Sequence, residues 1–309
     1  MKKNKTCLLT NDVETTSIWF NALRDETGLK VLKEGMPILL DIYQKYNIRS
    51  TFFFTGYIAK LYPEVVKMIL PYGHEVGSHS LSHLKENGHD VTDLKKQKYL
   101  LSESKKILED ISGQEVISFR APALRVNKYT PAALLETGYR IDSSVASQRF
   151  DMFFSFGTLN KLKWLTAPRK PYVVDPNSLF KKGSSNLVEV PLSATLFPYV
   201  GTTMRIFPGI TRLQRNVLNF ESKISGKPIV FDIHPNEFID ESSEPRIISR
   251  RSRNPLSSFV QDYLRAQLKT KNLGLNAIPL YESQINYFNG RGFEFGTIRD
   301  YCIKNNLLK

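Results

Sequence analysis

The chain has few of the residues that brace small secreted proteins or anchor proteins in membranes. It contains only two cysteines in 309 residues, Cys7 and Cys302, so the sequence does not indicate a disulfide framework. Both thiols are interpreted as packing residues. No apolar run approaches the roughly 20 residues of a membrane span. The run behind the basic residues 1–5 is about four residues long, too short for the core of a secretory signal. We therefore expect a reduced, cytoplasmic protein.

Zinc-finger spacing, an RNA-binding aromatic signature and a basic zipper are also missing, which makes nucleic acid an unfavoured partner. The formal net charge of +13 nevertheless predicts an anionic partner or surface. Each basic cluster alone is more simply interpreted as a solvated surface; the alternatives are anionic lipid headgroups at a peripheral membrane contact, a phosphorylated glycan carrier or nucleic acid. The clusters are Arg246, Arg250, Arg251 and Arg253, and then Arg265, Lys269 and Lys271.

Short β-rich runs alternate with helical patterns along most of the chain, which indicates parallel βα units. The predicted helices span Pro37–Tyr46, Pro63–Leu70, Val91–Ile111 and 130–137, the third ending at Gly113. Residues 150–185 are the least regular part and are expected to form an insertion or loop. The eight predicted strands, the number that a closed barrel needs, are Thr6–Asp12, Arg49–Phe54, His74–Ser78, Glu115–Arg120, Tyr139–Asp142, Leu187–Pro191, Ile229–His234 and Ala277–Tyr281.

Two histidines, His79 and His83, lie four residues apart at the start of a predicted helical turn. That spacing lets both imidazoles bind one metal ion. Asp12 and Glu14 alternate at the end of the first strand, so their carboxylates point the same way. The alternative for His79 and His83 is an ordinary solvated or hydrogen-bonded pair.

Polar residues also recur where the predicted strands end. Asp12, His79, Arg120, Asp142 and His234 all lie at or just past the carboxyl end of a strand. In a βα barrel, chemistry is assembled at that rim. Five such placements from separate strands predict one site.

These residues fall in six ordered motifs that resemble the polysaccharide deacetylases, also called NodB-homology proteins or carbohydrate esterase family four. The resemblance implies a single distorted (β/α) barrel with about seven or eight parallel strands. It also implies metal-assisted hydrolysis of an acyl group from an amine, usually the N-acetyl group of a sugar. Residues 1–309 are interpreted as one such domain, with a motif-bearing core at about 6–235 and βα elements in 236–309 that complete the barrel. The motifs are Thr10–Glu14, Ser50–Gly56, Gly73–His83, Phe119–Pro122, Gly138–Ser144 and Ile233–His234.

One motif departs from the family pattern. The common form has two consecutive aspartates, a general base and then a metal ligand, whereas here Asp12 is followed by Val13. Glu14 on the same strand face can supply the missing oxygen, as in relatives with Asp-x-Glu or Asp-x-Asp. The alternative register makes Asn11 the base, but an amide does not accept a proton usefully and would predict a dead enzyme.

The resemblance assigns further roles. Glu14, His79 and His83 would hold a divalent metal, by default zinc, and leave open positions as catalytic sites do. Asp12 would be the general base, Arg120 would hold it ionised, and His234 would protonate the leaving amine. Asp142 is favoured over Asp232 as the carboxylate that orients His234.

Other residues are given structural or open interpretations. His74 is interpreted as a satisfied structural histidine, and His89 as chemically silent. The aromatic segments 196–200 and 206–208 either pack, line an acceptor groove or touch a membrane. The alternatives to a glycan deacetylase are a hydrolase of another non-peptide amide, such as a deformylase or an allantoinase-like enzyme, and an inactive glycan- or membrane-binding relative.

Overall fold

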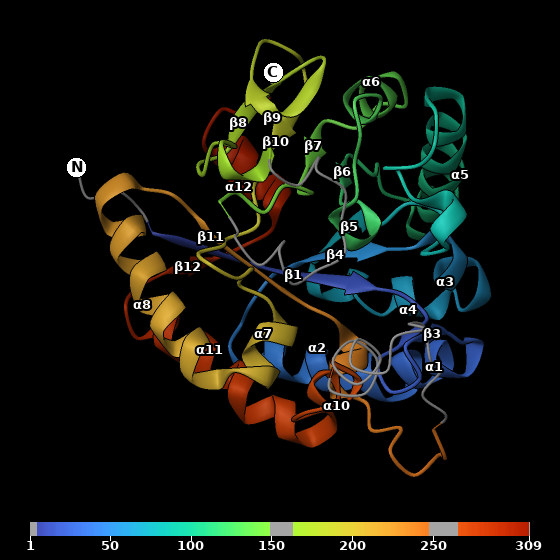
Figure 1. Ribbon diagram of the computed structural model, residues 1–309, viewed down its shortest axis with the longest axis vertical. Coiled ribbons are helices and arrows are strands. Elements are labelled where there is room, and N and C mark those ends of the chain that lie inside the picture. The colour runs from blue at the N-terminus through green and yellow to red at the C-terminus, as the bar shows by residue number, and fades with distance from the viewer. Residues whose placement is uncertain (1–4, 149–162, 247–264, 309) are drawn as a thin grey trace, which may run out of the picture.

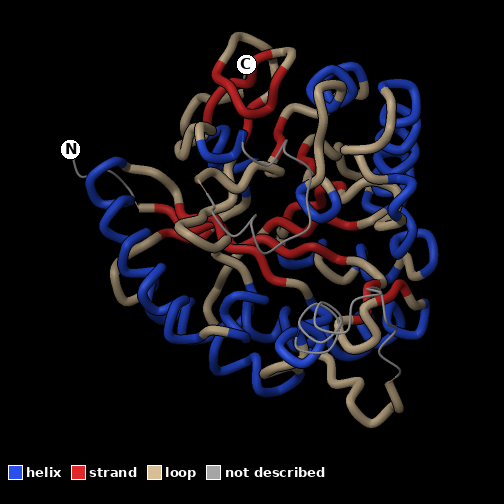
Figure 2. Tube along the Cα trace, viewed as in Figure 1, coloured by secondary structure: helices blue, strands red, loops and turns tan. Residues whose placement is uncertain are grey.

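The computed structural model describes residues 5–148, 163–246 and 265–308. A ten-stranded sheet curls through its centre and helices pack around the outside (Figure 1; Figure 2). Seven neighbouring strands of this sheet run parallel to one another. An eighth parallel strand, β12 (Glu294–Phe295), pairs with the start of β1, the first strand in the chain. The seven, in spatial order, are β11 (Ile229–Ile233), β1 (Thr6–Val13), β4 (Thr51–Phe54), β5 (Glu75–Ser78), β6 (Ser118–Phe119), β7 (Ile141–Asp142) and β10 (Val188–Glu189).

An antiparallel hairpin, β8 (Tyr172–Asp175) and β9 (Ser178–Lys182), extends the sheet beyond β10. The short strands β2 (Thr16–Ser17) and β3 (Ala22–Leu23) pair separately. No helix of the described residues is long and apolar enough to cross a membrane. The α-helices are α1 (Asp25–Lys30), α2 (Met36–Lys45), α3 (Gly56–Leu61), α4 (Glu64–Lys67), α5 (Leu94–Ser112), α6 (Thr130–Glu136), α7 (Gly201–Ile206), α8 (Pro208–Ser225), α10 (Arg265–Lys269), α11 (Ala277–Asn289) and α12 (Ile298–Lys304).

The space between β10 and β11 is bridged by an irregular segment. The Ser193 backbone N–H donates to the Val230 carbonyl at 3.1 Å, and Val200 forms an isolated parallel bridge with Asp232. The curled sheet is thus a distorted barrel with one irregular side. The expected α/β fold with about seven or eight parallel strands is confirmed.

The inside of the curl is apolar at one end and polar at the other. Leu8, Phe53 and Val230 belong to an interior apolar cluster that also includes Ile298 and Cys302 of α12. Two residues further along β1 and β11, the same strand faces carry polar residues instead. Strand alternation therefore places the polar side chains in one layer at the carboxyl ends of the strands.

Two expectations about the elements are wrong. Residues 277–281 begin helix α11 instead of forming a strand, because the buried residues over the longer window recur at helical spacing: Ala277, Tyr281, Gln284, Ile285 and Phe288. Part of the segment expected to be irregular forms the β8–β9 hairpin. The remainder of that segment includes residues 149–162, which lie outside the described residues.

Candidate active site

Strand β1 and the residue just beyond it present two carboxylates to the inside of the barrel. Asp12 and Glu14 are both 5% exposed. Asn11, between Thr10 and Asp12, points to the other face, where its amide donates to Ser50 Oγ at 2.7 Å and its oxygen accepts from the Tyr43 hydroxyl at 2.7 Å. The alternative register with Asn11 as base is therefore disfavoured, because its amide is occupied in the layer between sheet and helices.

The two histidines of the HxxxH motif lie on a loop that follows β5. The expected helical turn is wrong: residues 79–84 are not helical, and Ser80 adopts a φ of 61°. Buried His89, interpreted above as chemically silent, braces this loop, since its Nε2 lies 2.9 Å from Ser80 Oγ and its Nδ1 lies 3.2 Å from Gln97 Oε1. The loop nevertheless brings the His79 and His83 rings to a centroid separation of 5.7 Å.

Glu14, His79 and His83 form a group whose ligand atoms all lie within 4.8 Å of one another. Glu14 Oε2 lies 3.2 Å from His83 Nε2, yet this buried oxygen has no hydrogen-bond partner among the described residues. His79 Nδ1 lies 2.8 Å from the Arg120 carbonyl oxygen, so this nitrogen carries the proton and Nε2 keeps its lone pair. Burial lowers the pKa of His79, although Asp12 and Glu14 oppose this. An orphaned carboxylate oxygen beside two imidazoles fits a divalent cation.

Arg120, at the end of β6, is fully buried and bridges two carboxylates. One guanidinium nitrogen donates to Asp12 Oδ1 at 3.0 Å and to Asp232 Oδ1 at 2.7 Å. Burial opposes ionisation of Asp12, but Arg120, with His79 and His234, holds its pKa below the ordinary value. Burial and the neighbouring Asp12 charge raise the pKa of Asp232 to about 7. Of the two carboxyl groups, Asp12 is the one that remains a carboxylate throughout the neutral range.

His234 follows β11 and faces both Glu14 and a carboxylate pair. Its Nδ1 lies 3.4 Å from Glu237 Oε1 and 3.9 Å from Asp232 Oδ2, and its Nε2 lies 4.0 Å from Glu14 Oε1. Burial disfavours the imidazolium, but Glu237, Asp232 and Asp12 outweigh it and raise the pKa of His234 to about 10. Glu237 in turn forms a fully buried ion pair with Arg205. These carboxylates hold His234 in its protonated form.

The structure does not bring Asp142 to His234, and that expectation is wrong. Asp142 Oδ1 accepts from Ser144 Oγ at 2.6 Å, and its carboxyl group interacts directly with Glu189 on the adjacent strand. The physical reason is strand order: β7 lies four neighbours away from β1, whereas Asp232 shares β11 with His234. Asp232 and Glu237 lie beside the His234 ring, where Asp142 was expected.

Glu237 was not found by sequence reasoning, although a signal for it exists. It lies three residues after His234, and its side chain also accepts from the His234 backbone N–H at 3.3 Å, which is capping-box geometry. His74, in contrast, is placed as expected. It is buried and accepts the Ser50 backbone N–H at 3.0 Å, and burial lowers its pKa to about 4.

The family profile described as polysaccharide deacetylase matches residues 8–141, a stretch that contains the first two carboxylates, both motif histidines and Arg120. This stretch belongs to the polysaccharide deacetylase family. His234, Asp232 and Glu237 lie beyond the matched stretch.

Curated relatives carry names of the same family, and a solved structure shares the fold. A peptidoglycan deacetylase of Helicobacter pylori is 29% identical over 150 residues, which cover 46% of this chain and 50% of that protein. A peptidoglycan-N-acetylglucosamine deacetylase of Bacillus cereus is 32% identical over 104 residues, 34% of this chain and 47% of that protein. The chain thus spans half or less of these relatives. The structure of a Mycobacterium smegmatis protein assigned as a polysaccharide deacetylase superposes with a TM-score of 0.54 at 22% identity, covering 75% of this chain and 78% of that one.

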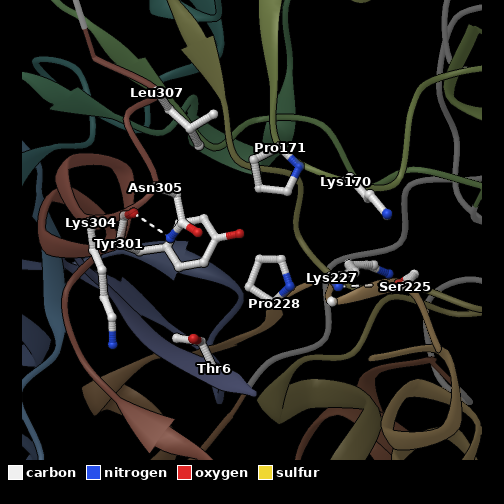
Figure 3. A pocket seen from close by; sticks show the side chains of 11 residues that line it. Thr6, Lys170, Pro171, Ser225, Lys227, Pro228, Tyr301, Lys304, Asn305 and Leu307 are labelled. Atoms are coloured by element: carbon white, nitrogen blue, oxygen red, sulfur yellow. Dashed lines mark hydrogen bonds between the residues drawn. The ribbon is translucent and has the colours of Figure 1, made fainter. Parts of the chain in front are cut away.

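A separate pocket of about 430 Å³ lies at the opposite end of the sheet, beside the starts of β1 and β11 (Figure 3). Its lining includes Lys170, Lys227 and Lys304. Lys227 donates to Glu221 at 3.0 Å and Lys304 to Glu294 at 2.5 Å. Two of its three ammonium groups are therefore already partnered, and the pocket is remote from the carboxyl ends where the family site lies.

Proposed function

We propose that this protein is a metal-dependent hydrolase that removes an N-acyl group, in the simplest case N-acetyl, from a sugar of a glycan or glycan precursor. The observation that carries the proposal is one connected cluster at the carboxyl ends of the strands. It joins the Glu14, His79 and His83 group to the Asp12–Arg120 pair and to protonated His234. A base, an acid and a three-ligand group at one place are the parts that amide hydrolysis needs.

Glu14, His79 and His83 would hold the divalent cation, and their donor set of two nitrogens and one oxygen suits zinc. When bound, the cation supplies Lewis acidity toward the acyl oxygen. The chain prepares this role by keeping the His79 Nε2 lone pair free and the Glu14 oxygen unpartnered.

Asp12 would accept the proton of the attacking water. Arg120 keeps the carboxylate ionised by binding Oδ1, which leaves Oδ2 toward the cluster, 3.7 Å from His79 Nε2. His234 would donate the proton that the leaving amine needs. Glu237 and Asp232 keep that proton on the ring and are both on the Nδ1 side, so Nε2 faces Glu14 and the inside of the cluster.

A glycan is the proposed substrate class, since the relatives from Helicobacter pylori and Bacillus cereus are named for peptidoglycan deacetylation. A carrier-linked or nucleotide-linked precursor in the cytoplasm is the more specific proposal. Cell fractionation and assays on precursor and mature glycans test it.

The decisive experiment combines elemental analysis of purified protein with acetate and formate release from a panel of N-acylated sugars. We expect one equivalent of divalent metal and acetate release from at least one sugar, both lost in the His79→Ala/His83→Ala variant. Formate release, or turnover of a non-sugar amide alone, would favour the alternative amide hydrolase. Metal binding without turnover of any amide would favour an inactive glycan-binding relative.

A further inference from the structure

Helix α8 has its polarity reversed relative to an ordinary surface helix. Its buried positions are mostly polar: Thr211, Gln214, Leu218, Asn219 and Ser222. Five of its exposed positions are apolar, and they are spaced by alternating steps of three and four residues, so they form one continuous stripe. The apolar stripe consists of Ile210, Leu213, Val217, Phe220 and Ile224, which are 38%, 66%, 48%, 65% and 65% exposed.

The rotation of α8 about its axis is set by specific contacts, so the outward stripe is not an accident of orientation. Near the middle of the helix, Gln214 donates to the Phe197 carbonyl at 2.8 Å. The next residue, Arg215, donates to the Ser283 carbonyl at 2.9 Å on α11, which runs beside α8 (Figure 1). Toward the C-terminal end, Arg169 binds Glu221 through two nitrogens. Turning the stripe inward would break all three contacts.

The apolar surface continues past the helix. Phe207, at the N-terminal end of α8, is 41% exposed, and Leu196 in the neighbouring loop is 62% exposed. The Phe207 ring contacts the Phe197 ring with a centroid separation of 6.5 Å. A contiguous apolar surface of this kind marks an interaction site in a soluble protein.

The side of α8 that faces α11 is cationic. Arg212 and Lys223 are exposed on α8, and the guanidinium groups of Arg215 and Arg291 both lie over the Tyr287 ring, 4.4 and 3.6 Å from its centroid. Burial lowers the pKa of Arg215, and the neighbouring Arg212 and Arg291 lower it further. At the C-terminal end of α8, Ser225 and Gly226 line the lysine-containing pocket (Figure 3).

We propose that α8 is a docking element for an anionic lipid bilayer, with the apolar stripe entering the interface and the cationic flank on the headgroups. An apolar face bordered by cations is the pattern of helices that lie in the membrane interface. A second copy of this chain is the less favourable occupant, because it would bring an identical cationic flank and a net charge of +13 against this one. The inference does not rest on the deacetylase activity.

The test is co-sedimentation of the full chain with vesicles of phosphatidylcholine and phosphatidylglycerol in equal parts, compared with pure phosphatidylcholine. Wild type should bind the mixed vesicles, and binding should fall with salt. Leu213→Ser/Phe220→Ser should weaken binding at least about tenfold through lost apolar burial. Arg212→Glu/Lys223→Glu, which keeps the stripe intact, should weaken it by a similar factor. Val91→Ser removes an equally exposed apolar side chain elsewhere (65% exposed) and should bind as wild type.

Failure of wild type to bind the mixed vesicles would overturn the proposal, as would unchanged binding of both double variants. Sedimentation equilibrium without lipid tests whether a second copy of this chain binds the stripe. A wild-type dimer that Leu213→Ser/Phe220→Ser converts to monomer would assign the stripe to a second copy and would also overturn the proposal. Circular dichroism spectra and melting temperatures confirm that the variants are folded. Since binding is measured without turnover, an inactive enzyme leaves the result intact.

Discussion

Two buried pairs of acidic residues lie within the same barrel and behave in opposite ways. Asp12 and Asp232 share the Arg120 guanidinium, and the pKa of Asp12 is held below its ordinary value. Asp142 and Glu189 are equally buried on neighbouring strands, and burial raises the pKa of both, that of Glu189 more strongly because Asp142 adds to it.

The difference is the hydrogen-bonded cation. Among the described residues, no other group donates a hydrogen bond to Asp142 Oδ2 or Glu189 Oε2. The only available donor is a carboxyl proton carried by one of these two residues. A buried acidic pair without a cation keeps its protons and serves packing, whereas Arg120 lets one member of the other pair, Asp12, stay charged and available for chemistry while the pKa of Asp232 is raised. We therefore expect substitutions in the Asp12 cluster to change metal binding and turnover, and substitutions in the Asp142–Glu189 pair to change stability.

The largest effect is expected from the metal group. His79→Ala/His83→Ala should lose stoichiometric metal and all measurable turnover while the barrel stays folded, because the interior apolar cluster does not include these residues. Elemental analysis and the melting temperature measure the two parts. Full metal occupancy in this variant would show that the site lies elsewhere.

Asp12→Asn separates the base from the ligands. The variant should keep its metal and lose about 10²–10⁴-fold in kcat, the usual contribution of a general base. Glu14→Ala should show the opposite pattern: its affinity for the metal should fall strongly, and turnover should be lost because the metal is lost. If Asp12→Asn released the metal and Glu14→Ala kept it, the roles of the two carboxylates would have to be exchanged.

His234→Ala should slow amide hydrolysis by up to about 10²–10⁴-fold. It should affect an activated aryl acetate far less, because a phenolate leaves without a proton. The ratio of the two rates is the measurement. Equal slowing of both substrates would contradict the general-acid role and favour a role for His234 in metal geometry or packing.

Glu237→Gln should slow amide hydrolysis by roughly tenfold, as expected for a partner that orients a functional histidine, and should leave aryl acetate hydrolysis nearly unchanged. The matched control is Asp142→Asn, which should change neither rate, since Asp142 contacts Ser144 and Glu189 instead of His234. A rate defect in Asp142→Asn that matched Glu237→Gln would remove the distinction between the two carboxylate pairs. Circular dichroism on both variants checks that they are folded.

The smallest effect is a pH-dependent gain in stability. Because the pKa of Glu189 is higher in the folded than in the unfolded state, the folded protein binds its proton more tightly and loses stability as pH rises above the unfolded value. Glu189→Gln keeps a donor toward Asp142 without ionising. The free energy of unfolding of the variant minus that of wild type should increase with rising pH, by at most about 1.4 kcal/mol per pH unit. Denaturant titrations at several pH values above 5 measure this; parallel curves would contradict it.

The sequence alone was sufficient for the parts of the fold that depend on local patterns. Strands β1, β4, β5 and β11 and helix α5 agree with their predicted ranges to within a few residues. Helix α5 ends at Ser112 and is capped by Gly113, which adopts the expected left-handed conformation with a φ of 66°. Alternation along β1 also correctly put Asp12 and Glu14 on one face. Short-range periodicity and the φ preference of glycine decide these features, and both are visible in the sequence.

Only the tertiary structure decided which distant groups meet. It placed Asp232 and Glu237 beside His234, and it put Asp142 beside Glu189. It also turned the apolar side of α8 outward, although the same spacing predicts a core-facing helix when taken alone. Strand order, and contacts such as those of Arg205 with Glu237 and of Gln214 with the 195–197 loop, set these outcomes. They join residues far apart in the chain, and a local pattern carries no information about which partner a side chain will reach.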